Sequence, residues 1–198
     1  MSHYFVNDES VKSDKRNLYY EFNGVRFKFV SDNGVFSKNE IDDGSEILLK
    51  SYIEKGKKGK TLDVGSGIGV LGIIVSKIND VEVDMLEINK RAVELCKENI
   101  KNNEVKECVV YESNVYENAN GTYDVVISNP PIRAGKKVVF EILEKAKDYL
   151  NKDGELWVVI RKSQGADSAK KKMNEVYGNC EIVKRDKGFY VLKSVKIN

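Results

Sequence analysis

The chain has 198 residues, of which 41% are hydrophobic and 32% are charged. This is enough for one sizeable core but too short for two ordinary domains. The 33 basic and 31 acidic residues leave a net charge of +2. That balance excludes an acidic disordered chain and removes overall positive charge as an argument for nucleic-acid binding. No apolar run is long enough for a transmembrane helix, and the first residues lack the apolar core of a secretory signal.

The cysteines and the histidine limit the chemistry that we expect. Cys96, Cys108 and Cys180 are odd in number and widely spaced, and His3 is the single histidine. This pattern predicts neither a disulfide framework nor a metal site. His3, at the terminus, is a poor candidate for the base of a catalytic triad. We therefore expect a reduced, cytoplasmic, globular protein that holds no metal.

The N-terminal part predicts a β-hairpin followed by a short helix. After about 17 polar residues, residues 18–30 read as two strands around Asn23-Gly24, a typical hairpin turn. Asp42 to Ser45 then supply an N-cap candidate for a short helix that carries Ile47 to Ile53. We expect a single domain, with residues 1–55 as an N-terminal extension and residues 56–198 as the catalytic core.

From residue 60 strands and helices alternate. The expected strands are 61–64, 81–86, 108–111, 123–128, 156–160, 180–184 and 189–194, and the expected helices are 70–78, 89–102, 135–150 and 164–177. This order predicts a Rossmann-like, doubly wound α/β sheet that is mainly parallel. The last two strands are too close for a crossover helix and should pair as an antiparallel hairpin. Ligands bind at the carboxyl ends of the strands in such sheets.

The first candidate site is a glycine-rich turn between a strand and a helix. Its pattern is D-x-G-x-G-x-G, with Asp63, Gly65, Gly67 and Gly69. Gly65 and Gly67 allow tight turning and close approach of the backbone to a ligand. A pyrophosphate-binding turn favours G-x-G-x-x-G, and Asp63 would repel a pyrophosphate. The turn therefore suits a cationic ligand, such as the amino acid end of S-adenosylmethionine, held directly or through water.

Polar residues after the next two strands extend this site. Glu87 stands where an acid that binds a ribose diol is expected, although it also suits the N-terminus of the following helix. Asn114 could accept a hydrogen bond from an adenine amine or could be a loop residue. Glu87 and Asn114 complete the expected cofactor site, together with Ser66 and Ile88, which adjoin these motifs.

The most informative stretch is Asn129-Pro130-Pro131, at the end of the 123–128 strand. The two prolines remove two backbone donors. The Asn129 side-chain oxygen and the Pro130 carbonyl then form an acceptor-rich corner that could hold a planar amino group. Such acceptors localise the lone pair of an exocyclic amine and aim it at a methyl group, so positioning and preorganisation carry the catalysis. We therefore expect Asn129 and Pro130 to be catalytic, with Asn129 also near the cofactor.

Together these stretches resemble class I S-adenosylmethionine-dependent methyltransferases. Residues 32–37, 42–49, 129–136 and 155–160 resemble the methyltransferase small domain family, which includes ribosomal small-subunit guanine-N2 methyltransferases. The resemblance implies a seven-stranded sheet with one antiparallel strand, S-adenosylmethionine as donor and a guanine amine of 16S rRNA as acceptor. It places the substrate at six residues: Phe36, Ser37, Pro131, Ile132, Arg133 and Lys136.

The chain departs from the family pattern at two positions. Ile132 stands where many amino methyltransferases carry an aromatic residue that stacks on the target base, and Asn114 matches an adenine-binding aspartate. The chain also has no room for the second, degenerate domain of the better-known ribosomal members. It resembles the single-domain members.

Local charge favours RNA as the partner. Residues 133–173 contain 11 basic and 6 acidic residues, although solvated helix faces would account for part of this excess. Two other readings stay open: methylation of another amine, such as adenine N6 or a protein glutamine, and a non-catalytic S-adenosylmethionine- or RNA-binding domain. A nicotinamide dehydrogenase is disfavoured by the glycine spacing and the terminal hairpin.

Overall fold

The computed structural model describes residues 10–198; His3 lies outside this range. Its strands are β1 (Arg16–Phe22), β2 (Val25–Ser31), β3 (Thr61–Val64), β4 (Val83–Glu87), β5 (Cys108–Glu112), β6 (Tyr123–Ser128), β7 (Leu150–Arg161), β8 (Glu181–Asp186) and β9 (Phe189–Val195). Its α-helices are α1 (Asp43–Lys55), α2 (Val70–Asn79), α3 (Lys90–Asn102), α4 (Lys136–Tyr149) and α5 (Ala166–Tyr177).

Seven strands form one sheet in the order β5-β4-β3-β6-β7-β9-β8. The pairs among β5, β4, β3, β6 and β7 are parallel, whereas β9 runs antiparallel to both β7 and β8. This confirms the expected Rossmann-like sheet with its antiparallel C-terminal hairpin. The strand order reverses between β3 and β6, so the carboxyl ends of these two neighbours form the switch point where ligands bind in such folds.

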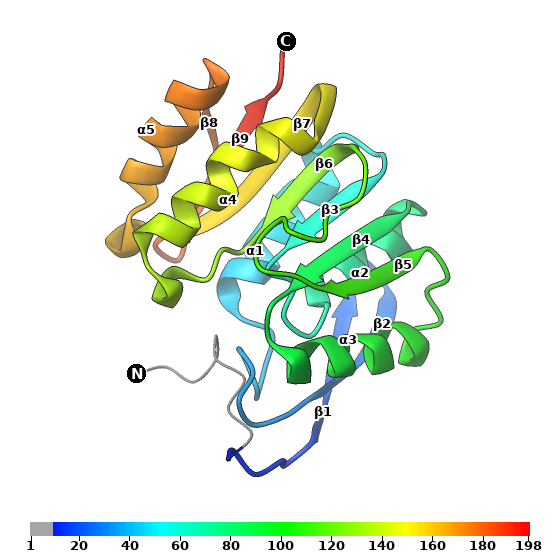
Figure 1. The fold of residues 1–198 in the computed structure, drawn as a ribbon. Helices are drawn as coiled ribbons and strands as arrows, with labels where there is room; N and C mark the ends of the chain where they lie inside the picture. Colours follow the sequence, from blue (N-terminus) through cyan, green and yellow to red (C-terminus); the bar gives the residue numbers. More distant parts are fainter. Residues whose placement is uncertain (1–9) are drawn as a thin grey trace.

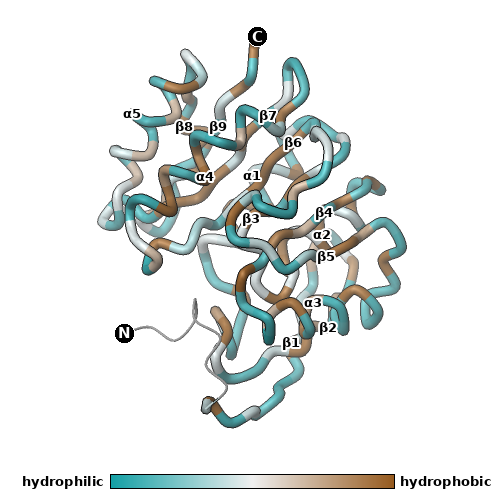
Figure 2. Tube along the Cα trace, in the orientation of Figure 1, coloured by the Kyte–Doolittle hydropathy of each residue, from teal (hydrophilic) through white to brown (hydrophobic). Residues whose placement is uncertain are grey.

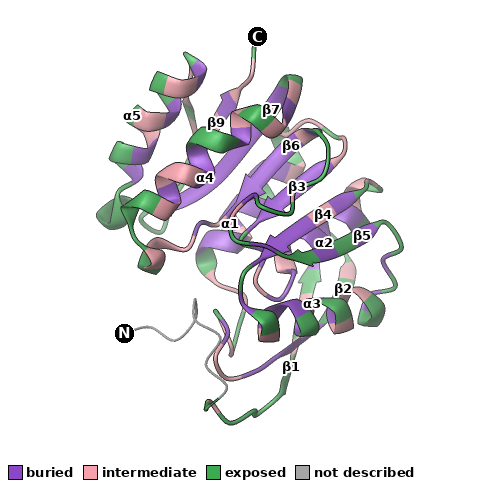
Figure 3. Ribbon diagram, viewed as in Figure 1, coloured by how far each residue is buried: buried purple, intermediate pink, exposed green. Residues whose placement is uncertain are grey.

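Helices cover both faces of the sheet (Figure 1). One buried cluster joins α1, α2 and α3 to one face, and a second joins α4 and α5 to the other. The central strands are buried on both sides, because their side chains alternate between two apolar layers (Figure 3). Figure 2 shows that much of these strands is hydrophobic.

The N-terminal hairpin β1-β2 forms a separate two-stranded sheet that is fixed to α3. The Asn99 amide bonds both backbone groups of Val30, with Oδ1 accepting at 2.6 Å and Nδ2 donating at 3.1 Å. The same Nδ2 donates to the carbonyl of Ile68 in the glycine turn at 2.9 Å. One buried asparagine therefore connects the hairpin, α3 and the turn.

Element bounds differ from the sequence-based ones at a few places. The largest difference is β7, which begins at Leu150 rather than 156 and follows α4 directly. Glu87 is the last residue of β4 and not a loop residue after it. The helix α1, assigned to the extension, packs against β7 and β9 of the main sheet. Among the described residues, none of the helices is long and apolar enough to cross a membrane.

Candidate functional site

A cavity of about 950 Å³ opens at the carboxyl ends of the central strands. Most of the expected site residues line it: Phe36, Ser37, Gly65, Ser66, Gly67, Glu87, Ile88, Asn114, Asn129, Pro130, Pro131, Ile132 and Arg133. Asp63, Gly69 and Lys136 are not in its lining. The first of two parts, which we call the glycine lobe, comprises Gly65 to Gly67 with Glu87, Ile88 and Asn114.

The glycine turn is built on left-handed backbone conformations. Gly65, Gly67 and Gly69 have φ of 74°, 56° and 92°. The amides of Gly65 and Ser66 both donate to the carbonyl of Leu86, at 2.9 and 3.0 Å, which holds the turn against the end of β4. A Cβ on Gly69 would lie 2.5 Å from the sulfur of Cys96, so Gly69 is needed for packing between α2 and α3. Gly67 instead faces open space.

Glu87 holds the turn in place with both carboxylate oxygens. Oε2 accepts from the Gly67 amide at 2.7 Å and Oε1 accepts from the Asn89 amide at 2.8 Å. Burial raises the pKa of Glu87, although these backbone hydrogen bonds oppose the shift. Each oxygen keeps a second lone pair, so the carboxylate could still accept ribose hydroxyls while it organises the turn.

Asp63 lies beneath the turn and is fully buried. Its Oδ2 accepts from the Gly72 amide of α2 at 3.0 Å, whereas Oδ1 has no hydrogen-bond partner among the described residues. Desolvation raises the pKa of Asp63 to about 7, and the nearby charge of Glu87 adds to the shift. Asp63 therefore presents a buried carboxyl that would gain from a cation bound above it.

The glycine lobe has the features that S-adenosylmethionine requires. The buried Ser66 hydroxyl and Asp63 Oδ1 have no partner, and a Cβ on Gly67 would meet nothing within 4 Å. The exposed Ile88 offers an apolar surface for a ring, and Asn114 donates from Nδ2 to Glu117 Oε1 at 3.2 Å. That bond leaves the Asn114 Oδ1 as an acceptor, as an adenine amine needs.

The second part of the cavity, the Asn129 lobe, comprises Asp42, Ser45, Asn129, Pro130 and Pro131. It adjoins the glycine lobe, because a Cβ on Gly65 would lie 3.6 Å from Pro131 Cδ. The Ser128 hydroxyl donates to the carbonyl of Val64 at 2.7 Å and fixes the end of β6 to the end of β3. The position of the Asn129 lobe relative to the glycine turn is therefore fixed.

Sequence reasoning identified Asn129 but missed its two partners. The Nδ2 of Asn129 donates to Asp42 Oδ1 at 3.1 Å and to Ser45 Oγ at 3.0 Å. The sequence predicted an N-cap within Asp42 to Ser45, and Asp42 is that cap, with Oδ1 accepting from the Ser45 amide at 3.1 Å. The contacts join residues 84 and 87 positions apart, and no local pattern predicts them.

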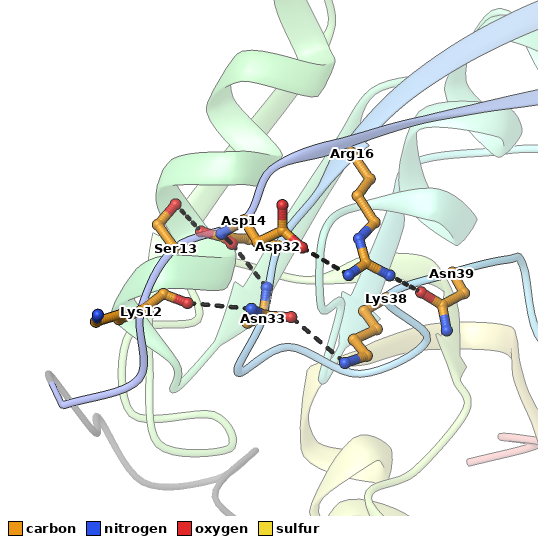
Figure 4. Close-up of polar contacts among 8 residues, drawn as sticks. All are labelled: Lys12, Ser13, Asp14, Arg16, Asp32, Asn33, Lys38 and Asn39. Carbon is orange, nitrogen blue, oxygen red and sulfur yellow. Dashed lines mark hydrogen bonds and ion pairs between the residues drawn. The ribbon is translucent and has the colours of Figure 1, made fainter.

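A loop after β2 carries Phe36 and Ser37 to the cavity. Figure 4 shows the polar contacts that hold this loop to the segment before β1. Asp32 accepts from the Ser13 hydroxyl at 2.6 Å, and Arg16 bonds Asn39. Burial would raise the pKa of Asp32, but hydrogen bonds from Ser13, Asp14 and Asn33 outweigh it and the pKa falls.

The remaining candidates for substrate contact differ in exposure. Ile132 is partly buried in the lining, Arg133 is exposed beside it, and the Lys136 amine lies 4.9 Å from the ring centre of Phe140. Phe189 and Arg161 also line the cavity, although they were not among the site residues expected from sequence. The Arg161 guanidinium lies 4.2 Å from the ring centre of Phe189. Among residues 10–198, no group of three or more His, Cys, Asp or Glu is placed to hold a metal ion.

Comparison with known proteins gives a consistent assignment. Residues 26–193 match the model of the methyltransferase small domain family. The chain is 41% identical to the uncharacterized protein YbxB of Bacillus subtilis over 98% of both chains. It is 38% identical to ribosomal RNA small subunit methyltransferase C of Haemophilus influenzae, over 64% of this chain and 39% of that one.

Solved structures share the fold. The 16S rRNA N2 methyltransferase RsmC of T. thermophilus, in complex with AdoMet and guanosine, superposes with a TM-score of 0.84 at 23% identity. The superposition covers 92% of this chain and 50% of that one, so the chain spans about half of the RsmC protein. A ribosomal protein L11 methylase from Lactobacillus delbrueckii has a TM-score of 0.68 at 18% identity. By its match over residues 26–193, the chain belongs to the methyltransferase small domain family.

Proposed function

We propose that the protein transfers the methyl group of S-adenosylmethionine to the exocyclic N2 amine of a guanine in 16S rRNA. The observation that carries this proposal is the Asn129 lobe. Its asparagine directs both amide hydrogens at the protein, which leaves the side-chain oxygen for a ligand, directly beside a glycine lobe suited to the donor.

The glycine lobe binds the donor. Glu87 takes the ribose hydroxyls and Asn114 the adenine amine, while Gly67 permits close approach. Asp63, which lies beneath the turn and outside the cavity lining, stabilises the charge of the amino group from below, directly or through water. When bound, S-adenosylmethionine supplies a methyl group on a positively charged sulfur, which is a strong electrophile.

The Asn129 lobe binds the amine. The Asn129 Oδ1 and the Pro130 carbonyl accept the two N–H groups, which localises the lone pair that is otherwise delocalised into the base. Two fixed acceptors also set the line of attack. The methylated amine is a strong acid and releases its proton to water, so the lobe requires no strong base.

The choice of guanine in rRNA rests on the relatives. Methyltransferase C of H. influenzae is a small-subunit rRNA methyltransferase by name, and the T. thermophilus structure contains guanosine. Arg133 adds a positive charge at the cavity lining. Lys172, further along the chain, forms an ion pair with Glu144 at 2.9 Å. With so modest a positive surface, the target base should lie in a loop or an unfinished junction, where bases are already unstacked.

Tritiated methyl transfer tests the proposal. Purified small subunits, large subunits, tRNA and a peptide-release factor are incubated with the protein and labelled donor. We expect label in 16S rRNA of the small subunit, in N2-methylguanosine after digestion. Label in the release factor alone would replace the proposal with glutamine methylation, and label in tRNA alone would discard the ribosome as the target.

A further inference from the structure

The side-chain amide of Asn129 is held by the first turn of a distant helix. Both of its hydrogen-bond acceptors belong to α1 or its N-cap: Asp42 Oδ1 at 3.1 Å and Ser45 Oγ at 3.0 Å. Nδ2 has two hydrogens, so these contacts use both. Among residues 10–198, no side chain or backbone group donates to Oδ1, which is therefore left to the cavity that Asn129 lines.

Orientation of this amide decides whether Asn129 attracts or repels an amine. The torsion of an asparagine amide is broad and nearly two-fold, so the side chain alone distinguishes poorly between its two orientations. The flipped orientation would point Nδ2 hydrogens at the N–H groups of the substrate. Asn129 therefore needs a fixed partner that favours one amide orientation, so that its oxygen faces the N–H groups of the substrate.

The two partners are not equivalent in this respect. A hydroxyl can donate or accept, so Ser45 could bond the amide in either orientation. A carboxylate accepts only, and Asp42 would face the oxygen of a flipped amide with no hydrogen between them. Asp42 is itself fixed, because the same Oδ1 accepts the Ser45 amide as the N-cap of α1.

We propose that Asp42, assisted by Ser45, is a positioning residue that fixes the Asn129 amide with its oxygen toward the substrate amine. The negative charge beside Nδ2 also polarises the amide and makes its oxygen a stronger acceptor. The N-cap of α1 thus has a second role in the reaction. This inference rests on the proposed function, because it assumes that Asn129 binds an amine.

A double-mutant cycle tests the role. We expect Asp42→Ala to lower kcat roughly tenfold, the scale of one charged hydrogen bond, and Ser45→Ala to lower it less. The affinity for S-adenosylmethionine should change by less than about twofold, since the glycine lobe is untouched. In an Asn129→Ala background, Asp42→Ala should cause no further loss. An equal further loss would mean that Asp42 acts only by stabilising the fold.

Two further variants control for damage to the helix. Asp42→Asn keeps an oxygen that can cap α1 and accept from Asn129, and should restore kcat to within about threefold of wild type. Ser51→Ala removes another buried hydroxyl of α1, which donates to the carbonyl of Ile47 at 2.8 Å, and should leave kcat unchanged. If Ser51→Ala lowers kcat as much as Asp42→Ala, the positioning role is refuted.

NMR of the ligand-free protein reads the orientation without any reaction. The Asn129 amide pair is identified by its loss in Asn129→Ala. We expect slow exchange with water for these two hydrogens, and faster exchange in Asp42→Ala and Ser45→Ala but not in Ser51→Ala. Unchanged exchange in Asp42→Ala overturns the inference even if the protein is active. A protein that methylates none of the acceptors but shows these effects would refute the proposed function alone.

Discussion

The two lobes of the cavity are organised in different ways. The glycine lobe is held by contacts between the turn after β3 and the end of the neighbouring strand β4, such as the Gly65 and Ser66 amides on Leu86 and the Gly67 amide on the Glu87 carboxylate, which is 20 positions away. The Asn129 lobe joins β6 to α1, across 84 and 87 positions of sequence. The first lobe depends on the pairing of neighbouring parallel strands, whereas the second also depends on the packing of α1 against the sheet.

Because the two lobes are built separately, we expect donor binding and turnover to respond to different variants. Changes in the glycine lobe should act on the affinity for S-adenosylmethionine, and changes in the Asn129 lobe on kcat. Each variant below therefore tests whether the two lobes can be uncoupled.

The largest effect is expected from Asn129→Ala. It removes the proposed acceptor for the amine, and kcat should fall by roughly 10²-fold or more, the scale of losing one preorganised polar contact. Titration calorimetry should show donor affinity within about threefold of wild type, because the glycine lobe is intact. Asn151→Ala, which removes an amide bonded to Asp124 far along the chain, is the matched control. Near-normal turnover of Asn129→Ala on its RNA would remove Asn129 from the mechanism.

Gly67→Val should act on binding instead. Its side chain would project into open space next to the ligand, and we expect donor affinity to fall by roughly tenfold or more, the scale of one or two lost contacts. Gly121→Val is the control for backbone strain, since Gly121 also has a left-handed φ of 92° and open space around it but does not line the cavity. Equal losses of affinity in both variants would show that strain alone is responsible.

Donor affinity should rise with pH through the pKa of Asp63, which burial raises to about 7. The cationic amino group favours the ionised carboxyl, so binding near pH 6 should release a proton, and affinity should gain up to about tenfold per pH unit below the pKa. Calorimetry in buffers of different ionisation enthalpy measures that proton. Asp63→Asn should abolish the release, and a release that persists would assign it to another group, such as Glu87.

The raised pKa of Asp63 also affects the stability of the ligand-free protein. The folded chain holds a proton on Asp63 that the unfolded chain, with a pKa near 3.8, gives up. The contribution of Asp63 to the free energy of unfolding therefore falls as pH rises from about 4 to about 7. Denaturant titrations at several pH values should show a flatter profile for Asp63→Asn. An unchanged profile would mean that the pKa of Asp63 in the folded chain is close to its ordinary value.

The smallest effect is expected from Asn114→Asp. It keeps an oxygen acceptor for the adenine amine but loses the bond to Glu117 and places two carboxylates side by side. Donor affinity should stay within about threefold, whereas Asn114→Leu, which has no acceptor, should bind roughly tenfold more weakly. Normal binding by the Leu variant would make Asn114 a loop residue only.

The sequence predicted the sheet and the glycine turn, but not the partners of Asn129. Strand-helix alternation predicted the sheet and its antiparallel hairpin, and the glycine spacing identified a turn that the structure places at the switch point. The early start of β7 at Leu150 was not predicted, because the residues from Asn151 to Glu155 are polar or glycine and lack the apolar pattern of a buried strand. The partners of Asn129 could not be predicted, since Asp42 and Ser45 reach it only through the packing of α1 against the sheet.

The most direct test of the central claim is nucleoside mass spectrometry of 16S rRNA. RNA is compared from a strain that lacks the protein and from the same strain carrying the wild type or Asn129→Ala. We predict that one N2-methylguanosine is missing without the protein, returns with the wild type and does not return with Asn129→Ala. An unchanged set of methylated nucleosides in 16S rRNA, or full restoration by Asn129→Ala, would contradict the assignment of this site to amine methylation.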